Sequence, residues 1–328
     1  MTLLQAIQKF SEKIQVTDRQ EKTIDSSITY LRDNLLNPEK DGLHVTDVFV
    51  NGSYERDTII RPLDDVDVFA VLDPEKHFEN GMLPDPKSIL QKMKKYLSEI
   101  LDYEGKLTRD VPCITLELSK INFDILPSFQ ASDDLYYIPT YDLSGWTISE
   151  PKVLSAQLNE INKTRKYLVK PTIHCIKKWN VINDKYVPSF HIEEIAISLF
   201  QWREVKNLYD GILHWFENSE SRFDIGKFKS QDALDKAVTR HNTALKTLSK
   251  AKEEYEDGNE DDAIVLWKQV FGIDFPTLDE EEAKNFNKAL SEGTLKVAAS
   301  GAISMNIGIT AAASKGFYGN ENSQTNRK

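Results

Sequence analysis

Three aspartates have the residue type and spacing for metal-assisted chemistry. Asp65 and Asp67 stand one residue apart in an apolar segment at 63–72, and Asp124 interrupts a second apolar segment at 121–126. Both segments are typical of strands, in which side chains alternate between two faces, so we expect Asp65 and Asp67 to share a face. Neighbouring carboxylates repel each other unless a cation lies between them. The pattern therefore predicts a site for a pair of divalent metal ions.

A Gly-Ser pair precedes these aspartates. Gly52 and Ser53 follow a predicted strand at 45–50, and eleven residues separate Ser53 from Asp65. A glycine lets backbone N–H groups approach a phosphate closely, and the serine adds a hydroxyl donor. Two Mg²⁺ ions (Mn²⁺ is an alternative), held about 3.5–4 Å apart by the aspartates, would activate an attacking hydroxyl and stabilise a departing pyrophosphate. The combination predicts a nucleotidyl-transfer site.

Each motif alone also has a simpler explanation. An Asp-x-Asp motif is usually a solvated strand edge or turn, and Asp124 could be a hydrogen-bonded group of the core. A Gly-Ser pair is common in turns. The conjunction of a Gly-Ser pair after a strand, an Asp-x-Asp strand and a third aspartate on a later strand is much rarer. We therefore favour the metal-dependent site.

Composition limits the classes of partner. The chain has 328 residues, with 41 Lys and Arg against 52 Asp and Glu, for a formal charge of −11. Wrapping long nucleic acid needs clustered cations, so we expect none as a partner, whereas metal-bound phosphates remain compatible. Cys113 and Cys175 lie outside any Cys-x-x-Cys motif, which predicts reduced structural thiols. The sequence shows neither a signal peptide nor an apolar run of membrane-span length, so we expect a cytoplasmic protein without membrane contact.

Hydrophobic periodicity predicts an α+β protein. Two N-terminal helices should lead into a mixed sheet with flanking helices, and a helix should start at Asp85-Pro86. We expect irregular structure at 128–151, where Pro127 should end the strand of Asp124. Later helices are predicted at 152–168, 171–182, 190–206, 230–256, 261–271 and 278–291. We therefore predict a catalytic lobe at 1–150, a helical lobe at 151–292, and a small-residue-rich segment at 293–328 with a mobile end.

Several segments resemble one family of enzymes. The segment NGSYERDTIIRPLDDVDVF at 51–69 resembles the signature of polymerase-β-like nucleotidyltransferases, and within them most resembles the bacterial cGAS/DncV-like members. INFDILPSF resembles their third-carboxylate strand. VKPTIHCIKKWN, PSFHIEEIAI and LWKQVFGIDFP resemble later landmarks, so the resemblance covers roughly residues 20–276. This family makes cyclic oligonucleotide second messengers in anti-phage defence, and the resemblance implies its two-lobed fold.

The resemblance also implies a role for each matching residue. Asp65, Asp67 and Asp124 would hold the metal ions, and Asp124 would help to activate the attacking hydroxyl. Gly52 and Ser53 would hold the β- and γ-phosphates of the donor nucleotide. From the helical lobe, Lys177 and Ser189 would contact the triphosphate and Phe190 would stack on the donor base.

The residues of the helical lobe have alternative explanations. Lys177 and Lys178 could form the solvated face of a helix, Ser189 could be an N-cap, and Phe190 could fill the core beside Trp179. The sequence departs from the family at two positions, because Lys178 stands where an aromatic residue is expected and Asp57 where glycine is frequent. No metal-ligand spacing connects the three histidines that we interpret as structural or surface residues, which are His174, His191 and His241.

We expect an enzyme that joins nucleoside triphosphates, ATP among them, into a cyclic di- or trinucleotide with release of pyrophosphate. One alternative is a template-independent nucleotidyltransferase of RNA ends, of the poly(A)- or CCA-adding type, against which the acidic composition counts. Another is a non-catalytic, antitoxin-like nucleotide-binding protein, against which the three aspartates count. A regulatory protein and a downstream effector that binds the product are further predicted partners.

Overall fold

The computed structural model describes residues 1–37, 42–63, 65–78 and 80–277, together with 288, 292, 296–297, 303–304 and 309–310. Thr2–Phe275 form one compact unit, and Met1 with Pro276–Lys328 forms a second. In the second unit, β8 (Lys296–Val297) pairs with β9 (Ile303–Ser304) and β10 (Ile309–Thr310). Apart from these few positions, the predicted helix at 278–291 and the C-terminal segment at 293–328 lie outside the described residues. The predicted division at residue 150 stays a prediction.

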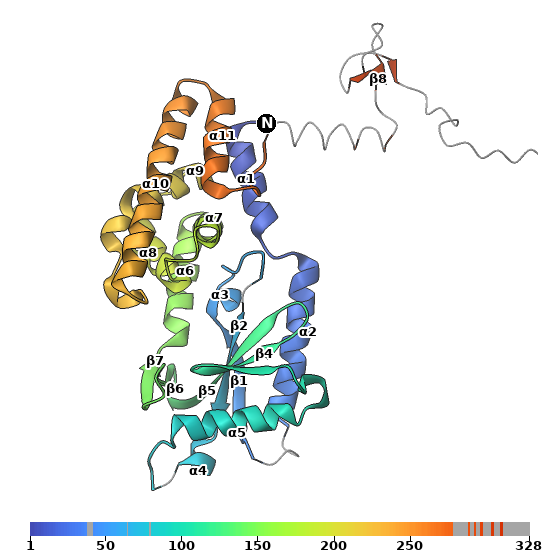
Figure 1. The fold of residues 1–328 in the computed structure, drawn as a ribbon, viewed down its shortest axis with the longest axis vertical. Coiled ribbons are helices and arrows are strands. Elements are labelled where there is room, and N and C mark those ends of the chain that lie inside the picture. Colours follow the sequence, from blue (N-terminus) through green and yellow to red (C-terminus); the bar gives the residue numbers. More distant parts are fainter. Residues whose placement is uncertain are drawn as a thin grey trace, which may run out of the picture. The chain divides into compact units, whose positions relative to one another are not determined.

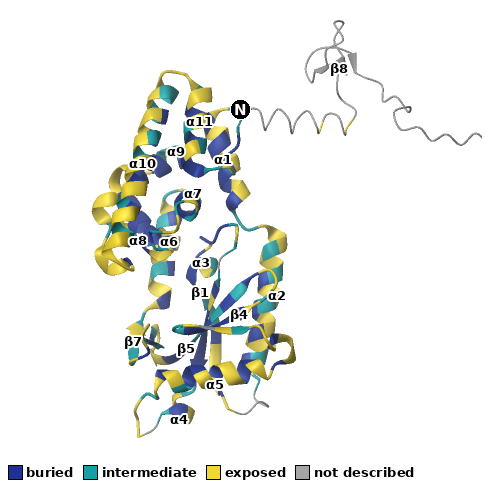
Figure 2. Ribbon diagram, viewed as in Figure 1, coloured by how far each residue is buried: buried dark blue, intermediate teal, exposed yellow. Residues whose placement is uncertain are grey.

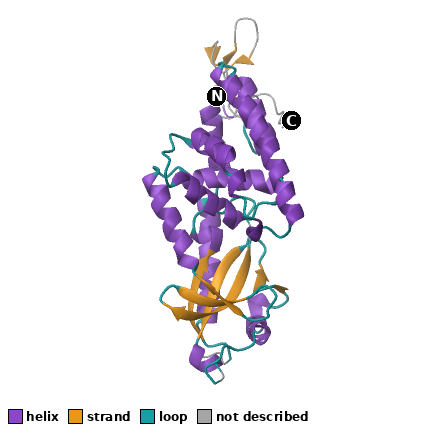
Figure 3. Cartoon of the chain, turned by 90° about the vertical axis from the view of Figure 1, so that its left-hand side faces the viewer, coloured by secondary structure: helices purple, strands orange, loops and turns teal. Residues whose placement is uncertain are grey.

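A mixed sheet organises the first half of the larger unit (Figures 1 and 3). Its order is β1-β2-β5-β4-β3, with β6 paired to β5 and β7 to β6. β2 and β5 are parallel, and the other neighbouring strands are antiparallel. The strands are β1 (Val45–Asn51), β2 (Val66–Leu72), β3 (Leu107–Asp110), β4 (Cys113–Glu117), β5 (Asn122–Ser132), β6 (Leu135–Pro139) and β7 (Trp146–Ser149). The predicted α+β class and mixed sheet are confirmed.

Two helices cover one face of this sheet, α2 (Asp18–Leu35) and α5 (Pro86–Ser98). Their apolar stripes pack on buried apolar side chains of β2 and β5, such as Val68 and Ile125. Figure 2 shows buried and exposed residues along both helices. α5 begins as predicted, because the Asp85 carboxylate accepts a hydrogen bond from the Ser88 N–H and Pro86 is the first helical residue. The opposite face of β2 carries Asp67.

Helices form the rest of the larger unit. The short helices α3 (Gly52–Glu55) and α4 (Pro74–His77) follow β1 and β2. α1 (Leu3–Ile14) packs against α7, α9 and α11, and the Phe10 ring lies 5.2 Å from Phe271 and 5.3 Å from Phe275 between centroids. The first predicted N-terminal helix thus packs on the helical half. The longer helices of that half are α6 (Pro151–Thr164), α7 (Val169–Ile182), α8 (Ser189–Phe200), α9 (Leu208–Asn218), α10 (Gln231–Glu256) and α11 (Glu260–Phe271).

Two predictions about these elements are wrong. The segment 128–151, expected to be irregular, contains β6 and β7, and β5 continues through Pro127, which pairs with Ala70 of β2. The helix expected at 190–206 ends at Phe200, where Arg165 donates hydrogen bonds to the carbonyls of Phe200 (2.8 Å) and Gln201 (2.6 Å). A tertiary contact therefore ends that helix.

Helix α9 was missing from the sequence prediction. Asn207 caps its start by accepting a hydrogen bond from the Asp210 N–H at 2.9 Å.

Among the described residues, none of the helices is both long enough and apolar enough to cross a bilayer.

Candidate active site

A row of paired residues crosses the sheet at the N-terminal end of β2. Asn51 of β1 stands opposite Asp67, Asp67 stands opposite Asp124 of β5, and Asp124 stands opposite Thr115 of β4. Residues in register on neighbouring strands project from the same face, so both carboxylates face the same side. β2 begins at Val66, and Asp65 therefore lies just before the strand in which we expected it.

The charged forms of both carboxylates are disfavoured in this site. Burial raises the pKa of Asp67 to about 6, and the charges of Asp124 and Asp65 add to that rise, while Arg56 opposes it. Burial also raises the pKa of Asp124, although Thr115 donates a hydrogen bond to its Oδ1 at 2.5 Å and stabilises the charged form. Asp67 keeps contact with solvent on the open face of the sheet. Negative charge is thus concentrated where a cation could approach.

The donor set fits a divalent cation that binds together with a nucleotide. Carboxylate oxygens are the ligands that Mg²⁺ prefers, and it often takes only one or two of them beside substrate phosphates and water. Among the residues that the structure describes, no three acidic, histidine or cysteine side chains are gathered as a complete ligand set. Asp67 and Asp124 would therefore hold such an ion together with phosphate oxygens.

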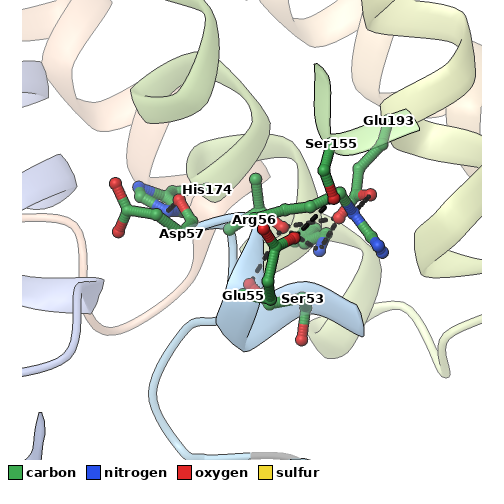
Figure 4. A network of polar contacts seen from close by, with 9 residues as sticks. Ser53, Glu55, Arg56, Asp57, Ser155, His174 and Glu193 are labelled. Atoms are coloured by element: carbon green, nitrogen blue, oxygen red, sulfur yellow. Dashed lines mark hydrogen bonds and ion pairs between the residues drawn. The ribbon is translucent and has the colours of Figure 1, made fainter. Parts of the chain in front are cut away.

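Gly52 makes room for Asp67. It starts α3 with a φ of +72°, and a β-carbon at this position would lie 1.7 Å from Oδ2 of Asp67. The backbone carbonyl of Ser53 accepts hydrogen bonds from the N–H groups of Thr58 (2.8 Å) and Ile59 (3.0 Å), which fixes the following loop. Figure 4 shows the Ser53 side chain directed away from the polar network around Glu193. The Gly-Ser turn therefore lies directly beside the carboxylate row.

A cleft of about 1540 Å³ opens over the carboxylate row. It brings together four of the predicted site residues, Gly52, Asp67, Asp124 and Phe190. Lys177, Ser189, Ser53 and Asp65 are not among the residues that line it. Apolar and polar side chains from both halves complete the walls, among them Phe69, Leu126, Gln157, Glu194 and Lys227. The volume is ample for nucleotides.

Phe190 and Ser189 stand at the start of α8. Phe190 is 46% exposed in the cleft, so the alternative that it fills the core is wrong. The Arg56 guanidinium carbon lies 5.9 Å and the Lys227 ammonium 5.6 Å from the centroid of its ring. Pro188, and not Ser189, occupies the N-cap position. An exposed aromatic face in the cleft can stack on a base.

Lys177 and Lys178 are both buried, so the alternative of a solvated helix face is wrong. Lys177 donates hydrogen bonds to Oε1 of Glu193 at 2.6 Å and to Oγ1 of Thr58 at 3.0 Å. Lys178 pairs with Asp274 at 2.6 Å. Both lysines therefore hold α7 to other parts of the chain.

Glu193 is a residue whose importance the sequence reasoning missed. Its fully buried carboxylate accepts hydrogen bonds from Arg56 Nε at 2.6 Å and Thr58 Oγ1 at 2.5 Å, besides the bond from Lys177 (Figure 4). Burial alone would raise the pKa of Glu193, but Lys177 and Arg56 hold it below its ordinary value. Glu193 thus joins the loop after α3 to α7 and α8. The signal was present, because all four residues lie inside the motif segments quoted above.

Asp57 and His174 form a second contact between the same segments. Asp57 has a φ of +54°, which explains why glycine is favoured here, since L-residues rarely adopt this conformation. Its carbonyl oxygen lies 3.0 Å from His174 Nε2, and its carboxylate lies 3.8 Å from Lys170 Nζ. Burial and the charge of Lys177 lower the pKa of His174 to about 4. His174, His191 and His241 are all buried, as expected of structural residues.

Comparison with known proteins identifies relatives. A family model of the Second Messenger Oligonucleotide or Dinucleotide Synthetase domain matches residues 1–162. A probable cyclic nucleotide synthase of Bacillus cereus is 27% identical over 276 residues, covering 70% of this chain and 82% of that protein. A cyclic AMP-AMP-AMP synthase of an Acinetobacter species is 25% identical over 283 residues, covering 78% of this chain and 80% of that protein.

Solved structures share the fold. CdnC of Escherichia coli MS115-1 matches both in a structure with ATP (TM-score 0.67) and in a complex with a HORMA protein (TM-score 0.66). Each match has 14% identity and covers 83% of this chain and 98% of that chain.

Proposed function

This chain belongs to the bacterial cGAS/DncV-like nucleotidyltransferases, and we propose that it joins nucleoside triphosphates, ATP among them, into a cyclic di- or trinucleotide with release of pyrophosphate. The observation that carries this proposal is the register of Asp67 and Asp124 on adjacent parallel strands beneath a nucleotide-sized cleft. The names of the two sequence relatives support a cyclic product.

In the proposed reaction, a ribose hydroxyl of one nucleotide attacks the α-phosphorus of another. A new P–O bond forms, the bond to the β-phosphate oxygen breaks, and pyrophosphate leaves. Asp124, which Thr115 holds in place, accepts the hydroxyl proton. Mg²⁺, held by Asp67, Asp124 and phosphate oxygens with Asp65 nearby, would neutralise the developing charge. Each further bond forms in the same way at the same carboxylates, so two transfers in total close a cyclic dinucleotide and three close a cyclic trinucleotide, with one pyrophosphate released in each.

The remaining predicted residues are proposed to hold the donor nucleotide. Phe190 stacks on its base, and the backbone at Gly52 with the Ser53 hydroxyl contacts its phosphates. Ser189 and Lys177 approach the triphosphate from the helical half. Lys177 would exchange at least one of its bonds to Glu193 and Thr58 for a bond to phosphate.

We further propose that the product is a second messenger in anti-phage defence in the cytoplasm, read by a downstream effector. The complex of CdnC with a HORMA protein supports a regulatory protein partner for this chain as well.

The test is incubation of the purified protein with Mg²⁺ and the four NTPs, with and without a short RNA, followed by mass analysis and a pyrophosphate assay. The proposal expects a cyclic di- or trinucleotide and pyrophosphate without RNA. Nucleotides added only to the RNA end would instead identify a terminal transferase. Nucleotide binding without pyrophosphate in either mixture would identify a non-catalytic binder, and both outcomes would overturn the proposal.

A further inference from the structure

We propose that Arg56 is a triphosphate-binding residue of the donor site and that Glu193 is the positioning residue that presents it to the cleft. The inference rests on the proposed function and deepens it, because it adds a residue pair to the phosphate site. Neither residue was assigned a role from the sequence.

The position of Arg56 supports a direct contact with substrate. It follows Ser53 by three residues at the end of α3 and lines the cleft together with Asp67 and Phe190. Its guanidinium carbon lies 5.9 Å from the Phe190 ring, and its charge opposes the rise in the pKa of Asp67. The guanidinium is therefore within reach of both the proposed base platform and the carboxylate row. A donor nucleotide that spans these two features would bring its phosphates to Arg56.

The hydrogen bonding of Arg56 leaves its phosphate-binding groups available. Arg56 is only 6% exposed, and its side chain donates from Nε to Glu193 Oε2 at 2.6 Å (Figure 4). A guanidinium has five N–H donors, and the four on its terminal nitrogens lie outside this bond. Two parallel N–H groups match two oxygens of a phosphate, which a lysine ammonium cannot reproduce. The bond from Nε to Glu193 fixes the plane of the Arg56 guanidinium before substrate binds.

The charge of the cluster favours an anion. Within the described part of the chain, Glu193 is a single buried carboxylate that accepts from two buried cations, Arg56 and Lys177. Because Glu193 also accepts from Lys177, it neutralises only part of the Arg56 charge, and a phosphate at the terminal nitrogens of Arg56 would add to that neutralisation. Lys177 is 4% exposed and does not line the cleft, whereas Arg56 does. Of the two cations that Glu193 holds, Arg56 is therefore the one that faces the cleft.

The experiment compares binding of α,β-methylene-ATP and of AMP in the presence of Mg²⁺ by calorimetry. Arg56→Lys keeps the charge and loses the planar fork. Loss of a charge-assisted bidentate bond is worth about 1.5–3 kcal/mol, so we expect the Kd for the triphosphate to rise roughly 10- to 150-fold. AMP lacks the β- and γ-phosphates, and its affinity should change by less than about threefold.

Two further variants separate positioning from general stability. Glu193→Asp keeps the carboxylate but withdraws it by one methylene, so it should also lower the preference for triphosphate over AMP. Lys170→Gln is the matched control, because it removes an ion pair between the same segments at Asp57, outside the cleft. Lys170→Gln should keep the wild-type preference for triphosphate over AMP.

A merely structural Arg56 would give a different result. If Arg56→Lys binds both ligands as the wild type does, or loses both equally, the inference is wrong. If Glu193→Asp fails to fold, the result for Arg56→Lys alone decides whether Arg56 binds the triphosphate. Wild-type protein that prefers triphosphate through Arg56 yet forms no product would overturn the proposed function and leave this inference standing. If the wild type forms a cyclic product and Arg56→Lys keeps the wild-type preference for triphosphate over AMP, the proposed function stands and this inference is wrong.

Discussion

Oδ2 of Asp67 occupies the space in which a β-carbon on Gly52 would lie, at a separation of only 1.7 Å. The two residues come from β2 and from the turn after β1, and this contact fixes how closely the turn approaches the carboxylate row. Glycine is therefore required here for two reasons, the positive φ and the missing side chain.

Gly52→Ala should abolish activity by displacing Asp67. A positive φ alone costs an alanine about 1–2 kcal/mol, so the matched control is Gly105→Ala, with a φ of +71° and no described atom within 4 Å of the added carbon. We expect the two variants to lose similar stability by thermal unfolding, with product formation lost only in Gly52→Ala. Equal activity in both variants would show that the contact with Asp67 does not matter.

Glu193→Gln should destabilise the protein strongly. Removing one partner of a buried ion pair costs about 3–5 kcal/mol, because Arg56 and Lys177 would remain buried without their carboxylate. The control is the neighbouring Glu194→Gln, which breaks a partly exposed pair with Lys227 at 2.9 Å and should cost less than about 1 kcal/mol. Denaturant titration measures both. Equal stability of the two variants would contradict a structural role for Glu193.

His174 should make the fold less stable as pH falls from about 6.5 to about 4. Its pKa is lowered from 6.5 to about 4 in the folded protein, so the unfolded state binds a proton first in this range. The loss amounts to roughly 3 kcal/mol. The raised pKa of Asp67 acts in the opposite direction, so the comparison is between wild type and His174→Gln. The variant should show a smaller loss of unfolding free energy, and parallel pH curves would refute the assignment.

Phe190→Ala should weaken nucleotide binding without unfolding the protein. Stacking of a base on an aromatic ring is worth about 1–3 kcal/mol, which corresponds to roughly a 5- to 150-fold change in Kd. Trp202→Ala is the control, since Trp202 is also exposed but does not line the cleft. Phe190→Tyr should retain binding. Equal affinities of Phe190→Ala and wild type would remove Phe190 from the donor site.

Strands, helix starts and the fold family could be predicted from the sequence, because each depends on the pattern of residues within a short segment. The pattern of residues in the two apolar segments predicted β2 and β5, because side chains in a strand alternate between two faces with a period of two. The capping pattern at Asp85 predicted the start of α5. The resemblance of residues 51–69 to a known signature predicted the fold.

Long-range pairing could not be predicted in this way. No local pattern gives the parallel register of Asp67 with Asp124, nor the bond between Arg56 and Glu193, which are 137 residues apart. The burial of Lys177 and the end of α8 at Phe200, where Arg165 contacts the chain, likewise depend on which helices pack together.

The most direct test of the central claim is product formation from NTPs and Mg²⁺ by the wild type, Asp67→Asn and Asp73→Asn. Asp73 follows the other end of β2 and caps α4 by accepting a hydrogen bond from the Glu75 N–H, which asparagine can also do. The account predicts a cyclic oligonucleotide and pyrophosphate from wild type and Asp73→Asn, and neither from a folded Asp67→Asn. Cyclic product at the wild-type rate from Asp67→Asn would contradict it.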